Sequence, residues 1–68
     1  MKVRYFADTD TAYLEFGKNA AAETREINEN IYLELDKDGN LVGMTIEHAS
    51  TQANISEISF QQMNQQAA

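Results

Sequence analysis

The 68-residue chain has no cysteine and only one histidine, His48. It therefore has no disulfide to support a small core, and one histidine alone cannot build a metal site. We expect neither a cofactor nor a metal. A chain of this length buries only about 60% of the surface that its unfolded form exposes, so association with another chain is the remaining way to stabilise the core. The absence of cysteine also fits a reducing compartment, and we expect a cytoplasmic protein.

Basic residues and long apolar runs are also scarce. Five Lys and Arg stand against eleven Asp and Glu, which leaves a net charge of −6. This charge repels a phosphate backbone, so we expect no nucleic-acid partner. No stretch approaches the roughly 20 apolar residues of a membrane helix, and Met1 leads into a strand pattern rather than a signal peptide, so no membrane partner is expected. The acidity suits a basic protein partner, although net charge also simply keeps a small protein soluble.

What the chain does contain is a β-hairpin pattern over residues 31–46. Two alternating arms flank Asp38-Gly39, a dipeptide typical of a two-residue type I′ turn. The pattern predicts a positive φ at Gly39, since only glycine adopts it there without steric cost. With this turn at the tip, three apolar pairs face each other: Leu35 with Val42, Leu33 with Met44, and Ile31 with Ile46.

A second hairpin is predicted at the N-terminus, where residues 2–6 and 12–16 alternate and residues 8–11 have turn composition. A four-residue loop sets three apolar pairs on one face: Val3 with Phe16, Tyr5 with Leu14, and Ala7 with Ala12. On the opposite face it sets two further pairs: Arg4 with Glu15, and Phe6 with Tyr13.

The remaining chain carries weaker patterns. Residues 17–22 read as a loop and residues 23–27 as a short polar edge strand. Asn54 and Glu57 have the spacing of a helix cap and predict a short helix over about residues 55–63, although residues 58–60 would also suit a strand.

Together these patterns predict an α+β, mostly β, fold. We expect a small antiparallel sheet built from two β-hairpins, with a short connecting strand and a short C-terminal helix. Residues 1–60 form a single domain, and residues 61–68 form a Gln-rich tail that frays.

Three groups of residues invite a chemical interpretation, and each has a simpler one. Asp36-x-Asp38-Gly39, with Glu34 at the first loop position, resembles the start of a calcium loop. Thr45 stands where the bidentate glutamate is needed, so a hairpin turn is favoured. Asp8 and Asp10 could hold a cation or serve acid/base chemistry, yet both suit a turn. His48 has Glu47 beside it and Ser50 two residues on, without the elbow motif of a hydrolase. We therefore predict no catalytic residue.

One feature indicates an interaction surface. In the predicted registers, the face opposite the core carries four large side chains: Phe6, Tyr13, Tyr32 and Leu41. A solvated face should be mostly polar, and a contiguous apolar patch marks an interface. Either the C-terminal segment or another chain covers this face, and we expect a homodimer or a higher homo-oligomer.

Several short pieces of the chain stand in a distinctive order and spacing. They are Lys2-Val3-x-Tyr5, Asp10-x-Ala12-Tyr13-Leu14, Ala22-Glu23-Thr24, the hairpin with Gly39 and Val42-Gly43, and Ala49-Ser50. Through them the chain resembles an uncharacterised prokaryotic family, domain of unknown function 2283, over residues 1–51. Phe6 stands where members often have Asp, while Thr45 and Glu47 replace a more usual Glu and an apolar residue.

The resemblance implies a small sheet protein with no established activity, cofactor or catalytic residue. Members are frequent neighbours of small toxin-like proteins, which implies an antitoxin role. Our leading hypothesis is a non-catalytic protein-interaction module that self-associates through its sheet. The alternatives are an antitoxin-like partner that neutralises a small basic toxin and an enzyme that uses His48 or the Asp8 and Asp10 pair.

Overall fold

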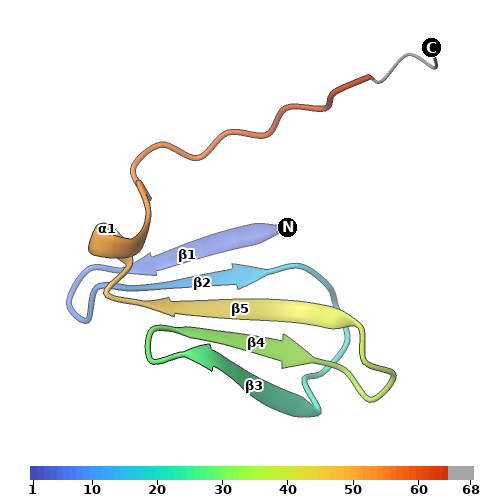
Figure 1. Cartoon of the computed structure of the whole chain (residues 1–68). Coiled ribbons are helices and arrows are strands. Elements are labelled where there is room, and N and C mark those ends of the chain that lie inside the picture. The colour runs from blue at the N-terminus through green and yellow to red at the C-terminus, as the bar shows by residue number, and fades with distance from the viewer. Residues whose placement is uncertain (65–68) are drawn as a thin grey trace.

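The computed structural model, which describes residues 1–64, is a five-stranded antiparallel sheet followed by one short helix (Figure 1). The elements are β1 (Lys2–Phe6), β2 (Thr11–Glu15), β3 (Glu23–Asn28), β4 (Ile31–Leu35), β5 (Leu41–Glu47) and α1 (Ala49–Gln52). The strand order is β1-β2-β5-β4-β3. The last strand of the chain therefore lies at the centre, between β2 and β4, and the predicted mostly β fold is confirmed.

The β4–β5 hairpin keeps most of its predicted register. Ile31 pairs with Ile46 and Leu33 pairs with Met44, as predicted. Leu35 pairs with Leu41 rather than with Val42, because the register shifts after Glu34. The extra residue on β5 forms a β-bulge, which bends the strand next to the turn.

The turn itself differs from the predicted type. Gly39 has a φ of 84°, so its predicted positive φ is confirmed. Asp38 is not among the described residues with positive φ, and a type I′ turn needs positive φ at both central positions, so that part of the prediction is wrong. The loop is longer: the Gly39 amide donates to the Asp36 carbonyl (3.1 Å), and the Asp36 amide donates to the Asn40 carbonyl (2.9 Å).

The β1–β2 hairpin is displaced from its predicted register by two residues. Val3 pairs with Leu14, and Tyr5 pairs with Ala12. The predicted pairs of Val3 with Phe16, Tyr5 with Leu14, Ala7 with Ala12, Arg4 with Glu15, and Phe6 with Tyr13 are therefore wrong. An even displacement leaves every side chain on its predicted face, because successive side chains of a strand alternate between faces.

The displacement follows from the loop between these strands, which contains residues 7–10 rather than 8–11. Asp10 closes the turn with a φ of 55°, a conformation that aspartate tolerates better than most residues. Arg4 and Glu15 still meet diagonally, with 3.4 Å between Arg4 Nη2 and Glu15 Oε2.

The predicted edge strand is present as β3, and all six of its residues are exposed. A register shift between Glu26 and Asn28 leaves Ile27 out of the pairing with β4, where its side chain is 53% exposed. A bulge of this kind is one way in which an edge strand avoids pairing with other chains.

The C-terminal helix is α1, so its predicted position over residues 55–63 is wrong. Asn54 and Glu57 do bond each other, with 3.3 Å between Nδ2 and Oε2, but they close a single turn. The apolar residues that follow lack a common helical stripe, so a helix there has no face to bury. Beyond Glu57 the described chain forms neither helix nor strand, and its last part runs away from the sheet (Figure 1). Residues 65–68 of the predicted frayed tail lie outside the described residues.

Candidate interaction surface

One side of the sheet, which we call the apolar face, carries nearly all of the large aliphatic side chains. Two rows run across the strands: Val3, Leu14, Met44 and Leu33 in one, and Tyr5, Ala12, Ile46 and Ile31 in the other. Most of these side chains are only half-buried. Among the described residues the buried hydrophobic side chains are Ala12, Leu35, Val42 and Ala49, and no large side chain is fully buried. The described residues of a single chain therefore do not enclose a complete hydrophobic core.

The residues after α1 cover one part of this face. A slot of about 280 Å³ lies between the sheet and this segment. The sheet side of the slot comes from Met1, Val3, Ala12, Leu14 and Ile46, and the other side comes from Ala53, Asn54, Ile55, Ile58 and Ser59. The segment after α1 therefore covers parts of β1, β2 and β5, whereas no residue of β4 lines the slot.

The opposite side of the sheet, which we call the outer face, holds three of the four side chains singled out from the sequence. Tyr13 and Tyr32 flank Thr45 in adjacent strands, and Phe6 pairs with Thr11 at the end of β1. Leu41 pairs with Leu35 at the bulge, so the structure does not group it with the aromatic residues.

Both tyrosines of the outer face lie among carboxylates. The Tyr13 hydroxyl donates to Glu34 Oε2 (2.9 Å), and this bond raises the pKa of Tyr13. The ring crosses β5 at Gly43, where any Cβ would lie 2.6 Å from the hydroxyl oxygen. Burial raises the pKa of Tyr32, and Glu47 adds to the effect. The outer face is therefore acidic and polar between its aromatic rings, and the uncovered aliphatic surface is on the other side.

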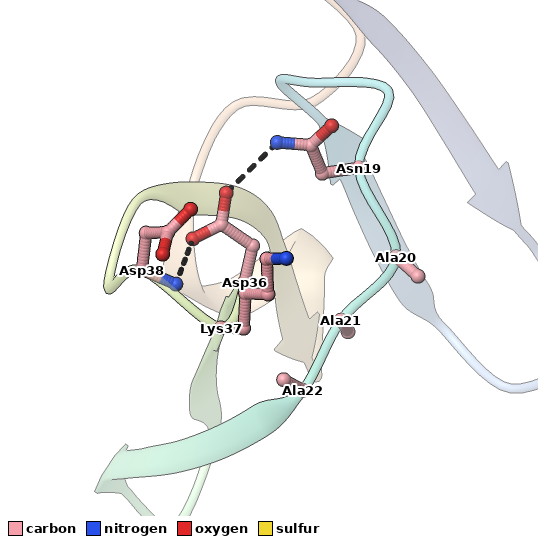
Figure 2. Close-up of a pocket in the computed structure, with 7 residues that line it drawn as sticks. All are labelled: Asn19, Ala20, Ala21, Ala22, Asp36, Lys37 and Asp38. Atoms are coloured by element: carbon pink, nitrogen blue, oxygen red, sulfur yellow. Dashed lines mark hydrogen bonds between the residues drawn. The ribbon is translucent and has the colours of Figure 1, made fainter.

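Asp36 lies at the centre of the hydrogen bonds that hold the β4–β5 turn. It is 5% exposed, and its carboxylate accepts bonds from the Asn19 side chain (2.9 Å) and the Asp38 amide (2.9 Å) (Figure 2). It also accepts bonds from the Asn40 amide (2.8 Å) and side chain (3.2 Å). These donors, Asn19 first, lower the pKa of Asp36 to about 2.

The same carboxylate borders a pocket of about 390 Å³, which is also lined by residues 20–22 and Lys37 (Figure 2). The Asp36 oxygens are occupied by N–H donors, and Glu34 bonds Tyr13 on the outer face. The carboxylates of the calcium-loop pattern therefore do not converge. Residues 1–64 contain no group of three or more His, Cys, Asp or Glu side chains placed to hold a metal ion.

Asp10 joins the first turn to α1. Its carboxylate accepts bonds from the Tyr5 hydroxyl (2.6 Å), the Ser50 hydroxyl (2.7 Å) and the Ser50 amide (3.1 Å). Its carbonyl oxygen accepts the amide of the fully buried Ala49 (2.8 Å). The bonds from Tyr5 and Ser50 lower the pKa of Asp10. No local sequence signal links Asp10 to Ser50, which lies 40 positions away.

The structure does not assemble a Ser-His-carboxylate arrangement from these residues. The His48 Nδ1 lies 2.9 Å from Asn30 Oδ1, and the Ser50 hydroxyl bonds Asp10 instead of His48. His48 has a φ of 54° and shapes the corner between β5 and α1.

Residues 1–64 define a small sheet protein with a single antiparallel layer, whose apolar face is only partly covered and whose other face is acidic. The family model described as "Protein of unknown function (DUF2283)" matches residues 2–50. The chain therefore belongs to the DUF2283 family, as the resemblance implied, and the match includes all five strands. Neither a curated protein nor a solved structure matches the chain. No helix within residues 1–64 has the length and apolar character needed to cross a membrane.

Proposed function

We propose that the chain is a non-catalytic protein-interaction module that forms a homodimer through the apolar face of its sheet. The observation that supports the proposal is the apolar face itself. A sheet that is apolar on one side must bury that side against a second layer, and within residues 1–64 only the segment after α1 lies over it.

The exposed area is large enough for such an interface. The chain exposes 5557 Å², whereas a compact monomer of its 7.7 kDa mass should expose about 4,300 Å². The excess is about 1,200 Å², and a standard interface buries about 800 Å² per partner.

Charge favours the same arrangement. Each copy has a net charge of −6, and four glutamates of strands β2, β3, β4 and β5 belong to the outer face by register: Glu15, Glu26, Glu34 and Glu47. Packing the two apolar faces together directs these four carboxylates away from the interface. Glu23 and Arg25 of β3 belong to the apolar face by register, where they pair with each other at its edge.

The test uses adjacent residues of the central strand. Met44 lies in the middle of the apolar face, whereas Thr45 lies on the outer face. We expect size-exclusion chromatography with light scattering, at micromolar concentration, to give twice the 7.7 kDa mass for the parent and for Thr45→Lys. Met44→Lys should give the mass of one chain, because a charge in the buried layer is costly. Leu33→Lys serves as the second variant if circular dichroism shows that Met44→Lys has lost its sheet. A monomeric parent would overturn the proposal.

We propose a second candidate function, an antitoxin-like role, because the outer face presents glutamates to solvent on the side that a dimer leaves free. A small basic toxin would meet complementary charge there, which speeds encounter and makes binding sensitive to salt. The expected observation is a short adjacent reading frame for a basic protein that co-purifies at low salt. Glu26→Gln/Glu47→Gln should weaken this association more than Glu57→Gln, which lies beyond the sheet. Failure to co-purify at low salt would count against the role.

A further inference from the structure

The C-terminal arm, which we define as residues 58–63, carries three large apolar side chains that remain mostly exposed. Ile58 is 64% exposed, Phe60 is 82% exposed and Met63 is 75% exposed. Ile58 and Ser59 still line the slot over β1, β2 and β5, but the residues after them leave the sheet (Figure 1).

The turn before the arm sets this outward direction. The Ile55 amide donates to the Ala53 carbonyl (3.1 Å), and the Glu57 amide donates to the Asn54 carbonyl (3.4 Å). The Ser56 hydroxyl also donates to Asn54 Oδ1 (2.8 Å). These bonds form a compact turn over the β1 and β2 side of the apolar face, and the β4 side of the same face stays uncovered.

A two-fold axis parallel to the central strand β5 would match the two halves of this face, because it reverses the order of the strands. Rotation about such an axis places the covered half of one copy opposite the uncovered half of the other. The arm from residue 58 to 63 is extended, and at about 3.3 Å per residue it spans close to 20 Å. Four strand spacings of about 4.8 Å give the sheet a similar width, so the arm can reach across the partner's β4.

We infer that, in the dimer of the proposed function, each copy lays its C-terminal arm on the β4 side of the partner's apolar face. Phe60 and Met63 of one copy then pack against Ile31 and Leu33 of the other. The exchange is reciprocal, so a closed dimer satisfies both arms and leaves none free to recruit a third copy.

Cysteine cross-linking tests the inference cleanly, because the parent has no cysteine. The double variant Leu33→Cys/Phe60→Cys is oxidised at micromolar concentration and examined on a denaturing gel without reductant. We expect a covalent dimer. A monomer with an internal cross-link, identified by its mass and altered mobility, would show that the arm folds onto its own face and would overturn the exchange. The absence of any disulfide would also overturn it.

A second measurement separates this inference from the proposed function. Phe60→Ser/Met63→Ser should raise the dissociation constant of the dimer by about ten-fold or more, because two large apolar side chains lose their burial. The matched control Gln61→Ser/Gln62→Ser should leave the dissociation constant unchanged. If the parent is a dimer and both double variants bind alike, the arm exchange is wrong while the dimer stands. If the parent is a monomer, both fail.

Discussion

Single residues carry the turn geometry of this sheet, and Gly39 shows how. Nothing lies within 4 Å of the position that a Cβ would take at Gly39, so only the backbone conformation, with a φ of 84°, demands glycine there. A β-branched residue is strained at positive φ, whereas asparagine tolerates it.

Replacing Gly39 therefore gives the first prediction. We expect Gly39→Val to lower the free energy of unfolding by about 1–3 kcal/mol, and Gly39→Asn to lower it by a clearly smaller amount. Thermal and denaturant melts of the two variants beside the parent provide the measurement. Equal losses would mean that the strain of a β-branched residue at positive φ does not govern this position.

Asp36 gives a prediction about pH. Its pKa is about 2 in the folded protein against an ordinary value of 3.8, so the folded state favours the ionised carboxylate. The resulting stabilisation is fully present above about pH 4 and is lost as pH falls toward 2. We expect Asp36→Asn to flatten the fall in melting temperature between pH 5 and pH 2, and Asp38→Asn, an exposed neighbour, to preserve it. A parent and an Asp36→Asn variant with parallel pH profiles would contradict this prediction.

At the scale of elements, the hydrogen bonds that Asp10 accepts from Ser50, which we call the Asp10–Ser50 latch, hold α1 against the first turn. Asp10→Asn keeps a residue that tolerates positive φ but replaces one carboxylate oxygen by an amide nitrogen. We expect the amides of Ala49 and Ser50 to exchange their hydrogens faster, while amides in β4 keep their protection. Asp8→Asn, on the same loop, is the control. Unchanged exchange at Ser50 would show that the latch does not hold the helix.

The elements also show how far the sequence predicts this fold. The alternation of the strands and the φ of Gly39 are local properties, and both were predictable. The bulge at Leu41 was not, because it accompanies a longer turn in which Asp36 accepts a bond from Asn19, 17 positions away. The register of the first hairpin depends on Asp10, whose partner Ser50 is 40 positions distant. The predicted helix over residues 55–63 was wrong because the Asn54 cap pattern is local, whereas α1 begins at Ala49, where Asp10 accepts the amides of Ala49 and Ser50.

The candidate surface was predictable only in part for the same reason. Alternation assigned most strand side chains to the correct faces, with Leu41 at the bulge as the exception, but the sequence does not show which face has a second layer. The position of the chain after α1 decides that, and it is a tertiary property of residues 53–59.

At the scale of the whole molecule, the missing layer predicts how stability depends on concentration. A dimer that shares one core melts at a higher temperature when more protein is present. For a two-state dimer of this size, a 100-fold increase in concentration should raise the melting temperature by roughly 10 °C. Met44→Lys should melt at one temperature throughout the same range. If the melting temperature of the parent does not depend on concentration, the single chain is stable without a partner and this prediction is wrong.

The central place of β5 has a consequence for the order in which the protein folds. During synthesis the two N-terminal strand pairs emerge first, and neither touches the other, because β5 bonds both β2 and β4. The sheet therefore cannot form until Glu47 has been added, and its completion requires pairing between strands that are distant in the chain, which slows folding. A nascent chain that ends before this strand consists of two unconnected hairpins, each with an apolar side in water.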